Sequence, residues 1–272
     1  LYIGKSTEVL IEGDYTQDKR NLDFGTGAIY YKIANTPRDL YLNLPWSYND
    51  AEQIAATATV THRLTNNWQI KSLVSTRKYN NDLFGATRPN SNSQFIDSSA
   101  ANYGRWIRGL VKNKNIENYN FASLDITGKF KTGKIKHSLL AGIDADIIKT
   151  KAYSFDFTRF RADKKNIYDT INIFGTKEYT SRNDIPNVPW TFYTNTPVNR
   201  LGVYLQDFVE LSSKIKLLAG LRYSVSTIET PDSIYANNNN KLNSKKRNND
   251  AFSPRLGLVY QPTKTISIFG SY

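Results

Sequence analysis

The lengths of the connections between strand-like segments constrain the fold of this chain more than any other feature. Nine segments alternate apolar and polar residues with the period of two that is typical of β-strands, and they fall at residues 4–16, 52–64, 68–79, 104–130, 134–151, 199–211, 215–228, 251–261 and 265–272. The connections are long at 17–51, 80–103, 152–198 and 229–250 and tight at 65–67, 131–133, 212–214 and 262–264. Successive connections of an antiparallel sheet lie at opposite ends. The pattern therefore predicts one end of long loops and one end of tight turns.

This alternation is typical of a β-barrel in a bacterial outer membrane, where short turns face the periplasm and long loops face the medium. The tight connections also contain residues that favour turns: Asn66 and Asn67 tolerate left-handed backbone angles, Gly133 has no Cβ, and Pro262 fixes its own φ. We therefore expect an all-β fold, an antiparallel transmembrane β-barrel segment of about nine strands with short periplasmic turns and long extracellular loops.

The two faces of the expected strands differ in polarity. Between residues 135 and 147, one face carries Ile135, Leu139, Ala141, Ile143, Ala145 and Ile147, and the other carries Lys136, Ser138, Gly142, Asp144 and Asp146. A carboxylate in hydrocarbon costs several kcal/mol, so we expect the polar face to line the barrel interior and the apolar face to contact lipid. Asp207 breaks the pattern, because it shares a face with Leu201, Val203, Leu205 and Val209. We expect it to lie near a rim.

Composition excludes several classes of protein. The longest apolar runs, such as residues 217–221, are far shorter than the roughly 20 residues of a transmembrane helix. The chain has no cysteine, which excludes disulfides, zinc–thiolate sites and thiol nucleophiles. The first residues show no secretory signal. Aromatic residues make up 13% of a chain whose mean hydropathy is −0.53, and this combination fits a membrane barrel.

Several segments resemble a known family. The sequences VYLQDFVELSSKIKLLAGLRYS at 203–224 and FSPRLGLVYQPTKTISIFGSY at 252–272 are similar to barrel motifs of TonB-dependent siderophore receptors. Residues 13–25, 35–46, 61–72 and 130–146 resemble successive barrel segments of the same family. Each motif alone is loose, but the order and spacing of the motifs agree over nearly the whole chain.

The resemblance implies an outer-membrane receptor that takes up a ferric siderophore, with no cofactor and no enzymatic activity. In that family, extracellular loops and an N-terminal plug bind the chelate, and the TonB energy-transducing complex acts on the plug. Family barrels have about 22 strands, so residues 1–272 are expected to be part of the receptor barrel domain, an internal fragment without the plug, the TonB box and the remaining strands. An unclosed sheet would leave unpaired backbone in lipid, which is costly.

Aromatic residues in the expected long loops are the candidates for ligand contact, because aromatic rings offer rigid contact area at low entropic cost. They are Tyr30, Tyr31, Trp46 and Tyr48 in the first loop and Trp190, Phe192 and Tyr193 in the third. The competing interpretation is the aromatic girdle that surrounds such barrels at the membrane interface. For any single residue, the girdle is the favoured interpretation.

No catalytic or metal site is predicted. His62 and His137 are the only histidines, and both fall beside tight turns, which favours structural positions at the periplasmic rim. No glycine-rich phosphate loop, zinc-ligand spacing or nucleophile elbow is present in the sequence.

Charged residues have more than one interpretation. Asp144 and Asp146 are expected to pair with interior arginines such as Arg222 and Arg255, or with the plug, rather than to perform acid–base chemistry. The net charge is +12, and basic stretches at 159–165 and 242–250 would attract an anionic chelate or the phosphates of lipopolysaccharide. Solvated loop charge explains these stretches equally well. Outer-membrane lipid and lipopolysaccharide are expected partners, and nucleic acid is not, because the basic residues form no single stripe with stacking aromatics.

Three alternatives stay open. A receptor of the same architecture could import another nutrient, such as haem, cobalamin or an oligosaccharide. A soluble all-β binding module would pack its apolar faces against each other, and the loop alternation argues against it. An outer-membrane enzyme would need a Ser/His/Asp or Asp/His cluster at the outer rim or on the lipid face, and the position of both histidines argues against that.

Overall fold

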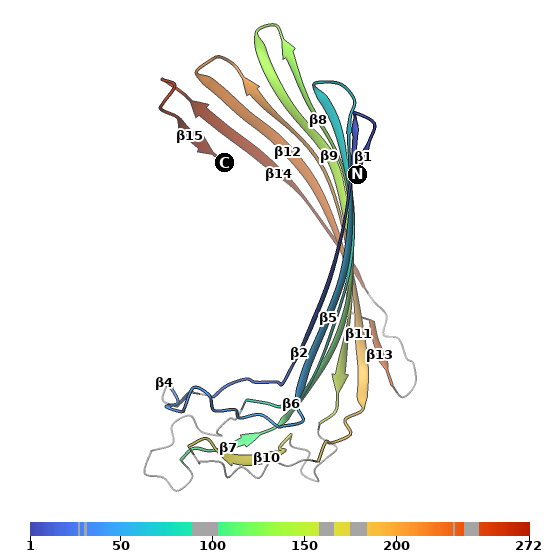
Figure 1. Ribbon diagram of the computed structural model, residues 1–272, viewed down its shortest axis with the longest axis vertical. Coiled ribbons are helices and arrows are strands. Elements are labelled where there is room, and N and C mark those ends of the chain that lie inside the picture. The colour runs from blue at the N-terminus through green and yellow to red at the C-terminus, as the bar shows by residue number, and fades with distance from the viewer. Residues whose placement is uncertain are drawn as a thin grey trace.

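The computed structural model describes residues 1–26, 28–29, 32–88, 103–157, 166–174, 184–230, 232–236 and 245–272. Over these residues the chain forms one large, curved antiparallel sheet and two small sheets (Figure 1). None of the described residues belongs to a helix that could cross a membrane. The fold is all-β, as the strand periodicity predicts.

The strands of the large sheet follow the order of the chain. They are β1 (Tyr2–Ile3), β2 (Thr7–Arg20), β5 (Tyr48–Arg63), β6 (Trp68–Ala86), β8 (Leu110–Thr132), β9 (Ile135–Phe155), β11 (Trp190–Glu210), β12 (Ile215–Glu229), β14 (Lys246–Tyr260) and β15 (Ile268–Ser271), with β13 (Asp232–Tyr235) beside β11. The nine predicted segments correspond in order to β2, β5, β6, β8, β9, β11, β12, β14 and β15. Because β1 and β15 stand at opposite edges, the described sheet is an open wall.

The tight connections lie at one end of this wall and the long connections at the other (Figure 1). At the tight-turn end, Gly133 joins β8 to β9 with a φ of 64°, a left-handed conformation that glycine adopts without steric cost. The loop end carries β3 (Ala28–Ile29), β4 (Lys32–Ile33), β7 (Arg105–Arg108) and β10 (Asp169–Asn172). The predicted alternation of connections is confirmed.

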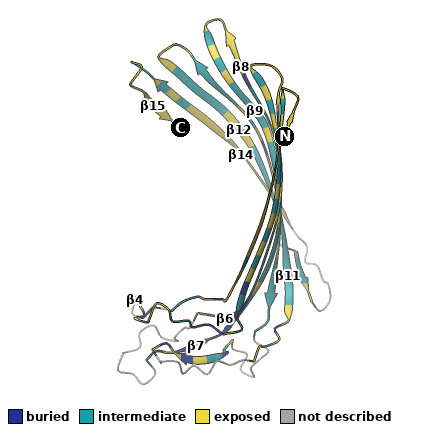
Figure 2. Cartoon of the chain, in the orientation of Figure 1, coloured by how far each residue is buried: buried dark blue, intermediate teal, exposed yellow. Residues whose placement is uncertain are grey.

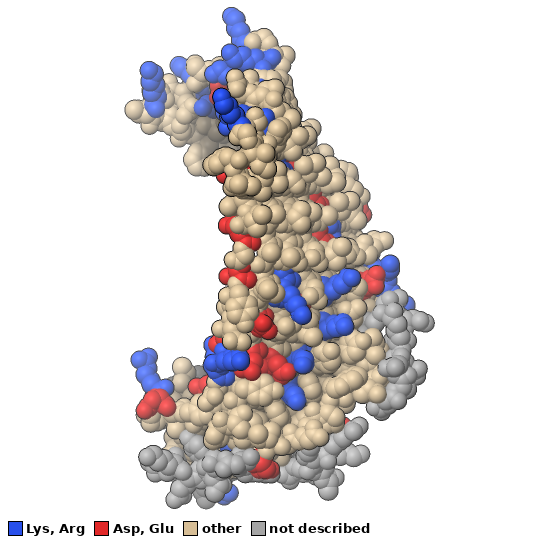
Figure 3. All heavy atoms as spheres, turned by 45° about the vertical axis from the view of Figure 1, so that its right-hand side comes forward, with Lys and Arg blue, Asp and Glu red and all other residues tan. Residues whose placement is uncertain are grey.

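The register between strands keeps apolar and polar residues on separate faces. Ile143 in β9 is paired with Leu124 in β8 and Val203 in β11, and all three side chains are exposed. The next residue, Asp144, is paired with Ser123. We call the face that carries Ile143 the outer face and the face that carries Asp144 the interior face. Figure 3 shows the convex side of the wall, where charged residues are sparse over a broad middle band.

The wall is a single layer, and its apolar outer face is uncovered. Its residues are mostly exposed or half-buried, and the buried hydrophobic residues lie at the loop end (Figure 2). A soluble protein rarely exposes a continuous apolar surface of this size, whereas a membrane barrel requires one. A soluble module would need a second layer to cover this face, and the described residues provide none. The uncovered apolar face therefore favours the membrane barrel over that alternative.

Most strands extend further at the loop end than the sequence predicts. β6, β9 and β11 have 19, 21 and 21 residues, whereas a membrane crossing needs about 9–11. The expectation that residues 17–20, 48–51, 80–86, 152–155, 190–198 and 246–250 belong to loops was wrong. Polar residues occupy both faces of such segments, as in Asn80, Asn81 and Asp82, so the period of two disappears. The backbone pairing between neighbouring strands nevertheless continues through these segments.

The predicted strand at 104–130 is two strands. β7 leaves the wall and pairs with β10, which places Trp106 opposite Ile171, and β8 begins at Leu110. Gly109 lies between them, and a Cβ at this position would come within 2.7 Å of the Asn166 carbonyl oxygen. The break therefore depends on a close approach that only glycine permits.

The hydrophobic core lies at the loop end. One cluster contains Leu44, Phe84, Ala86, Leu110, Tyr168 and Val188, and a second contains Ala34, Leu42, Trp106, Ile171 and Ile173. We call residues 34–47, 103–110, 166–174 and 184–189 the cap. It projects from the strand ends toward the concave side of the wall (Figure 1). The long connections thus form a packed structure at the mouth of the barrel segment.

Candidate functional site

Three long polar side chains on the interior face each reach across a glycine of the neighbouring strand. In the first crossing, Tyr204 of β11 is paired with Gly142 of β9, which is paired in turn with Asp125 of β8. The Tyr204 hydroxyl donates a hydrogen bond to the Asp125 carboxylate. A Cβ at Gly142 would lie 2.5 Å from the Tyr204 hydroxyl oxygen. Glycine therefore makes this crossing possible.

The second crossing is an ion pair. Arg222 of β12 reaches over Gly202 of β11, and its Nη1 and Nη2 donate to the two Asp144 carboxylate oxygens at 2.7 and 2.8 Å. Such paired hydrogen bonds fix the guanidinium in one orientation. The Arg222 Cζ also lies 5.3 Å from the centre of the Tyr204 ring, which joins the first two crossings.

The third crossing extends the network to the next strand. Arg255 of β14 reaches across Gly220 of β12, and its Nη1 donates to Gln206 Oε1 at 3.2 Å. The crossings together connect β8 to β14 over the interior surface. We call this network the polar ladder, formed by Asp125, Asp144, Tyr204, Gln206, Arg222 and Arg255.

The two interior carboxylates have different arginine partners. The expected pairing of Asp144 with Arg222 is confirmed. Asp146 instead pairs with Arg200, whose Nε is 2.9 Å from Asp146 Oδ1, because the register places these residues directly opposite each other. Arg255 contacts an amide oxygen rather than a carboxylate. Sequence spacing predicts the face of each residue, but the strand register decides the partner.

Replacing Gly202 with alanine should break the central crossing. The added Cβ would overlap the Arg222 guanidinium, so Asp144 would lose two hydrogen bonds. We expect a destabilisation of about 1–2 kcal/mol, seen as a lower temperature at which the folded band disappears from SDS gels. Gly257→Ala is the matched control, because its Cβ would make only contacts of 3.4 Å or more. Equal temperatures for the two variants would contradict the role of Gly202.

Arg108 is a fully buried cation in the cap. Its Nε donates to Asp169 Oδ1 at 2.8 Å, its Nη2 donates to the second oxygen of the same carboxylate, and its Nη1 donates to the carbonyl oxygens of Leu42 and Asn43 at 2.9 and 3.3 Å. One side chain thereby joins three long connections. Sequence analysis missed Arg108, because a basic residue in an alternating segment is expected to be solvated, and Gly109 was the only local signal of a break.

Two asparagine side chains in the cap form hydrogen bonds with backbone groups at the ends of β6 and β8. The Asn43 side chain donates to the Ala86 carbonyl and accepts from the Ala86 amide, both at 2.9 Å. Asn166 makes the same two bonds with Leu110, both at 2.9 Å. Backbone groups at the strand ends are thus paired although they are shielded from water. Burial raises the pKa of the Tyr41 hydroxyl in the same cap, so this group stays protonated.

The aromatic candidates of the first loop either pack against the cap or fall outside the described residues. Trp46 is half-buried against the first cap cluster. Tyr48 is the first residue of β5, and its hydroxyl donates to Asp82 Oδ1 at 3.1 Å. Tyr30 and Tyr31 lie outside the described residues. Packing explains the positions of Trp46 and Tyr48, and contact with a ligand stays a prediction for all four.

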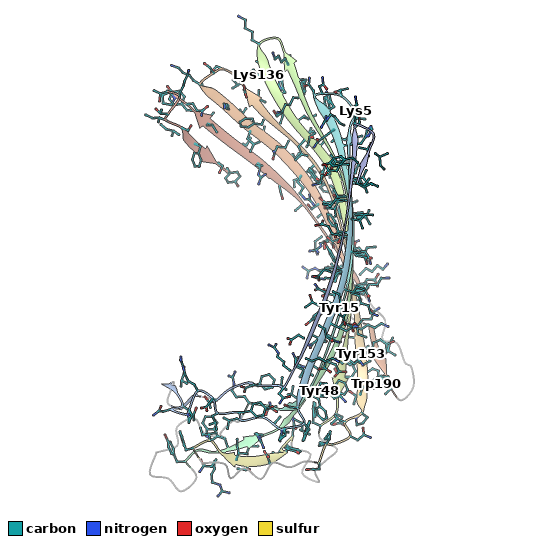
Figure 4. The ribbon with its side chains drawn as sticks, in the orientation of Figure 1. Lys5, Tyr15, Tyr48, Lys136, Tyr153 and Trp190 are labelled. Carbon is teal, nitrogen blue, oxygen red and sulfur yellow. The ribbon has the colours of Figure 1, made fainter. Side chains whose placement is uncertain are left out.

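The candidates of the third loop lie in β11, on both faces. Trp190 and Tyr193 are on the outer face, with ring centres 6.2 and 5.3 Å from that of Tyr153, and Figure 4 shows Tyr153 and Trp190 together near the loop end. This is the arrangement of an interfacial girdle. Phe192 is on the interior face, 5.5 Å from the Tyr235 ring. Of the three, Phe192 alone faces the barrel interior.

Both histidines lie at the tight-turn end, as predicted. His62 shares a hydrogen bond of 2.8 Å with the Thr7 hydroxyl. His137 Nδ1 is 2.6 Å from Asp207 Oδ2, and its ring stacks on Phe130 with centres 4.6 Å apart. Asp207 is thus accommodated on the outer face by a histidine beside the rim. Within the described ranges, no group of three or more His, Cys, Asp or Glu side chains could hold a metal ion.

The wall, its polar interior and its capped mouth agree with a single family. The family model described as TonB dependent receptor-like, beta-barrel matches residues 2–272. The chain belongs to the TonB-dependent receptor β-barrel family. It is therefore part of the wall of a barrel in the bacterial outer membrane. TonB-dependent receptors are transport receptors and not enzymes.

Named relatives and solved structures show the same fold. The metal-pseudopaline receptor CntO of Pseudomonas aeruginosa is 23% identical over 278 residues, which cover 97% of this chain and 35% of CntO. The siderophore receptor PiuA from Acinetobacter baumannii superposes with a TM-score of 0.77 at 20% identity, over 99% of this chain and 40% of PiuA. The open form of the ferric-catecholate import receptor Fiu from E. coli K12 gives a TM-score of 0.81 at 13% identity, over 98% of this chain and 44% of Fiu. The chain spans about a third of the length of the curated relatives it matches.

Proposed function

We propose that the protein carrying this chain imports a ferric siderophore across the bacterial outer membrane. The family match over residues 2–272 is the observation that carries the proposal, and the similar proteins PiuA and Fiu are named as a siderophore receptor and a ferric-catecholate import receptor. The family resemblance adds a plug inside the barrel, on which the TonB energy-transducing complex would act. Transport of this kind changes no covalent bond of the ligand, and we therefore propose no cofactor.

Both the polar ladder and the cap support this mechanism. The ladder presents arginines, carboxylates and a tyrosine hydroxyl to the interior, where a plug could form hydrogen bonds and slide between alternative partners. The cap has its own buried core and projects toward the concave side of the wall (Figure 1). A ligand would enter between the cap and the interior face, and interior aromatic rings at that level would contact it.

A complex of another metal is the second candidate ligand. The relative CntO is named as a receptor for metal–pseudopaline, so the family match alone does not select iron. Haem, cobalamin and oligosaccharides are further candidates within the same architecture. None of them changes the proposed route through the barrel.

Uptake by whole cells tests the proposal. A host without its own siderophore receptors would express the complete receptor and be given radioactive iron bound to a panel of siderophores, with a strain that lacks TonB as the control. We expect TonB-dependent accumulation of iron from at least one ferric siderophore. Uptake restricted to another metal chelate, haem, cobalamin or an oligosaccharide would contradict the ferric ligand, and uptake that is independent of TonB would contradict the mechanism.

Substitutions of Phe192 and Trp190 distinguish a ring that contacts the ligand from a ring of the interfacial girdle. Phe192→Ala removes an interior ring at the mouth, and we expect about a tenfold higher concentration for half-maximal uptake. Trp190→Ala removes a girdle ring from the outer face and should leave this concentration unchanged. The readout is the concentration dependence of initial uptake, at equal amounts of receptor in the membrane. The opposite order of effects would place the ligand away from the interior face.

A further inference from the structure

Lysines gather on the outer face just beyond the apolar band, toward the loop end. On β9 the band ends at Ile147, and Lys149 and Lys151 follow on the same face. Lys149 is paired with Asn118 of β8, which is paired in turn with Lys78 of β6. We call Lys78, Lys114, Lys149 and Lys151 the lysine patch. Figure 3 shows lysine and arginine side chains, with some acidic ones, in the part of this face that lies below the sparsely charged band.

Most of this positive charge has no counterion among the described residues. Lys114 Nζ is 3.5 Å from Asp82 Oδ2, whereas Lys151 Nζ lies over an aromatic ring. In the part of the chain that the structure describes, no carboxylate oxygen is within 4.0 Å of the ammonium groups of Lys78, Lys149 or Lys151. All three of these lysines are exposed. Cations on neighbouring strands repel each other unless an anion lies between them.

The depth of the patch in the membrane determines which anion is available. The patch begins one row beyond the hydrocarbon-facing residues and ends at Lys114, which is paired with the girdle residue Tyr153. Rings of this kind mark the boundary between hydrocarbon and headgroups. Lysine side chains are long enough to place their ammonium groups among the headgroups. At the loop end of an outer-membrane barrel, these headgroups belong to the outer leaflet.

We propose that the lysine patch binds the phosphate groups of lipid A, the membrane anchor of lipopolysaccharide. Lys78 and Lys149 flank Asn118 across two strand spacings, about 10 Å, so their ammonium groups can converge on one phosphate, and Asn118 adds an amide donor between them. Lys151 lies two residues further along β9 toward the medium, on the same face. The proposal depends on the wall and its orientation, and not on which ligand the receptor transports.

Binding of purified lipid A in detergent tests this site. The complete receptor, extracted from outer membranes, would be titrated with bis-phosphorylated and with dephosphorylated lipid A, and complexes would be counted by native mass spectrometry. We expect the triple variant Lys78→Gln, Lys149→Gln and Lys151→Gln to bind the bis-phosphorylated lipid about tenfold more weakly or worse, since each lysine near an anionic headgroup layer contributes appreciably. The unchanged receptor should discriminate against the dephosphorylated lipid to a similar degree.

Two further variants keep the test decisive. The triple variant Lys129→Gln, Lys131→Gln and Lys134→Gln removes the same charge from exposed lysines at the tight-turn end and should bind within about twofold of the unchanged receptor. Arginine at positions 78, 149 and 151 keeps the charge and should retain binding, which separates loss of charge from loss of folding. Equal binding of both lipids, equal loss in the two glutamine variants, or equal weakness of the arginine and glutamine variants of the patch would overturn the proposal.

Discussion

Arg108→Ala is expected to unfold the cap and to leave the wall intact. The substitution removes the only cation that pairs with Asp169 in the described structure and leaves the carbonyls of Leu42 and Asn43 without their donor. Breaking a buried ion pair from one side costs about 3–5 kcal/mol. Amide hydrogens of β7 and β10 should therefore exchange at least about 100-fold faster, while those at the centres of β8 and β9 keep their rates.

An exposed ion pair provides the control for this prediction. Lys246 Nζ is 3.2 Å from Glu229 Oε1, and the lysine side chain is 67% exposed. Its replacement by glutamine should change stability by less than about 1 kcal/mol. If Arg108→Ala left the exchange of β7 and β10 as slow as Lys246→Gln does, the cap would be held by its apolar clusters alone.

Leu124→Lys is expected to destabilise the barrel strongly, because it places a charge on the outer face near the middle of the apolar band. Leu124 is paired with Ile143, and both side chains are exposed. A lysine at this depth costs about 2–4 kcal/mol in a membrane barrel. We expect a matching loss in the free energy of unfolding, measured by denaturant titration of the complete receptor in lipid vesicles, and less receptor in the outer membrane.

A lysine at the neighbouring position is expected to have little effect on stability. Ser123→Lys introduces the same side chain one residue away, on the interior face and directly opposite Asp144, so the new charge meets water and a carboxylate. Its effect should stay within about 1 kcal/mol. A similar loss for both variants would mean that the two faces of β8 do not differ in environment, and the division of the wall into outer and interior faces would be wrong.

The sequence predicts the wall well because the membrane imposes a strict pattern. Residues such as Ile143 and Asp144 must alternate wherever one face meets lipid and the other meets water, so face, order and the ends of the connections can all be inferred. Outside hydrocarbon this constraint vanishes. The continuation of β9 to Phe155 and the departure of β7 at Gly109 depend on hydrogen bonds and close contacts between distant segments, which no local pattern contains.

The same reasoning explains what was missed in the site. The interior position of Arg222 follows from alternation, but its reach over Gly202 to Asp144 requires knowledge of the register between β9, β11 and β12. Glycine spacing on the interior face is the signal that could have indicated the crossings. Arg108 and Asp169 are 61 residues apart, so their pairing emerges only when the long connections are folded together.

Labelling of single cysteines on intact cells tests the central claim, which is that this chain forms a barrel wall with its long connections in the medium and its tight turns in the periplasm. The absence of cysteine from the chain makes each introduced thiol unique within it, and the receptor without an added cysteine gives the background. Asp39→Cys in the cap should react with a membrane-impermeant maleimide on intact cells, whereas Asn66→Cys in the turn between β5 and β6 should react only after the outer membrane is permeabilised. Equal labelling of both positions on intact cells, or labelling of Asn66→Cys alone, would contradict the account.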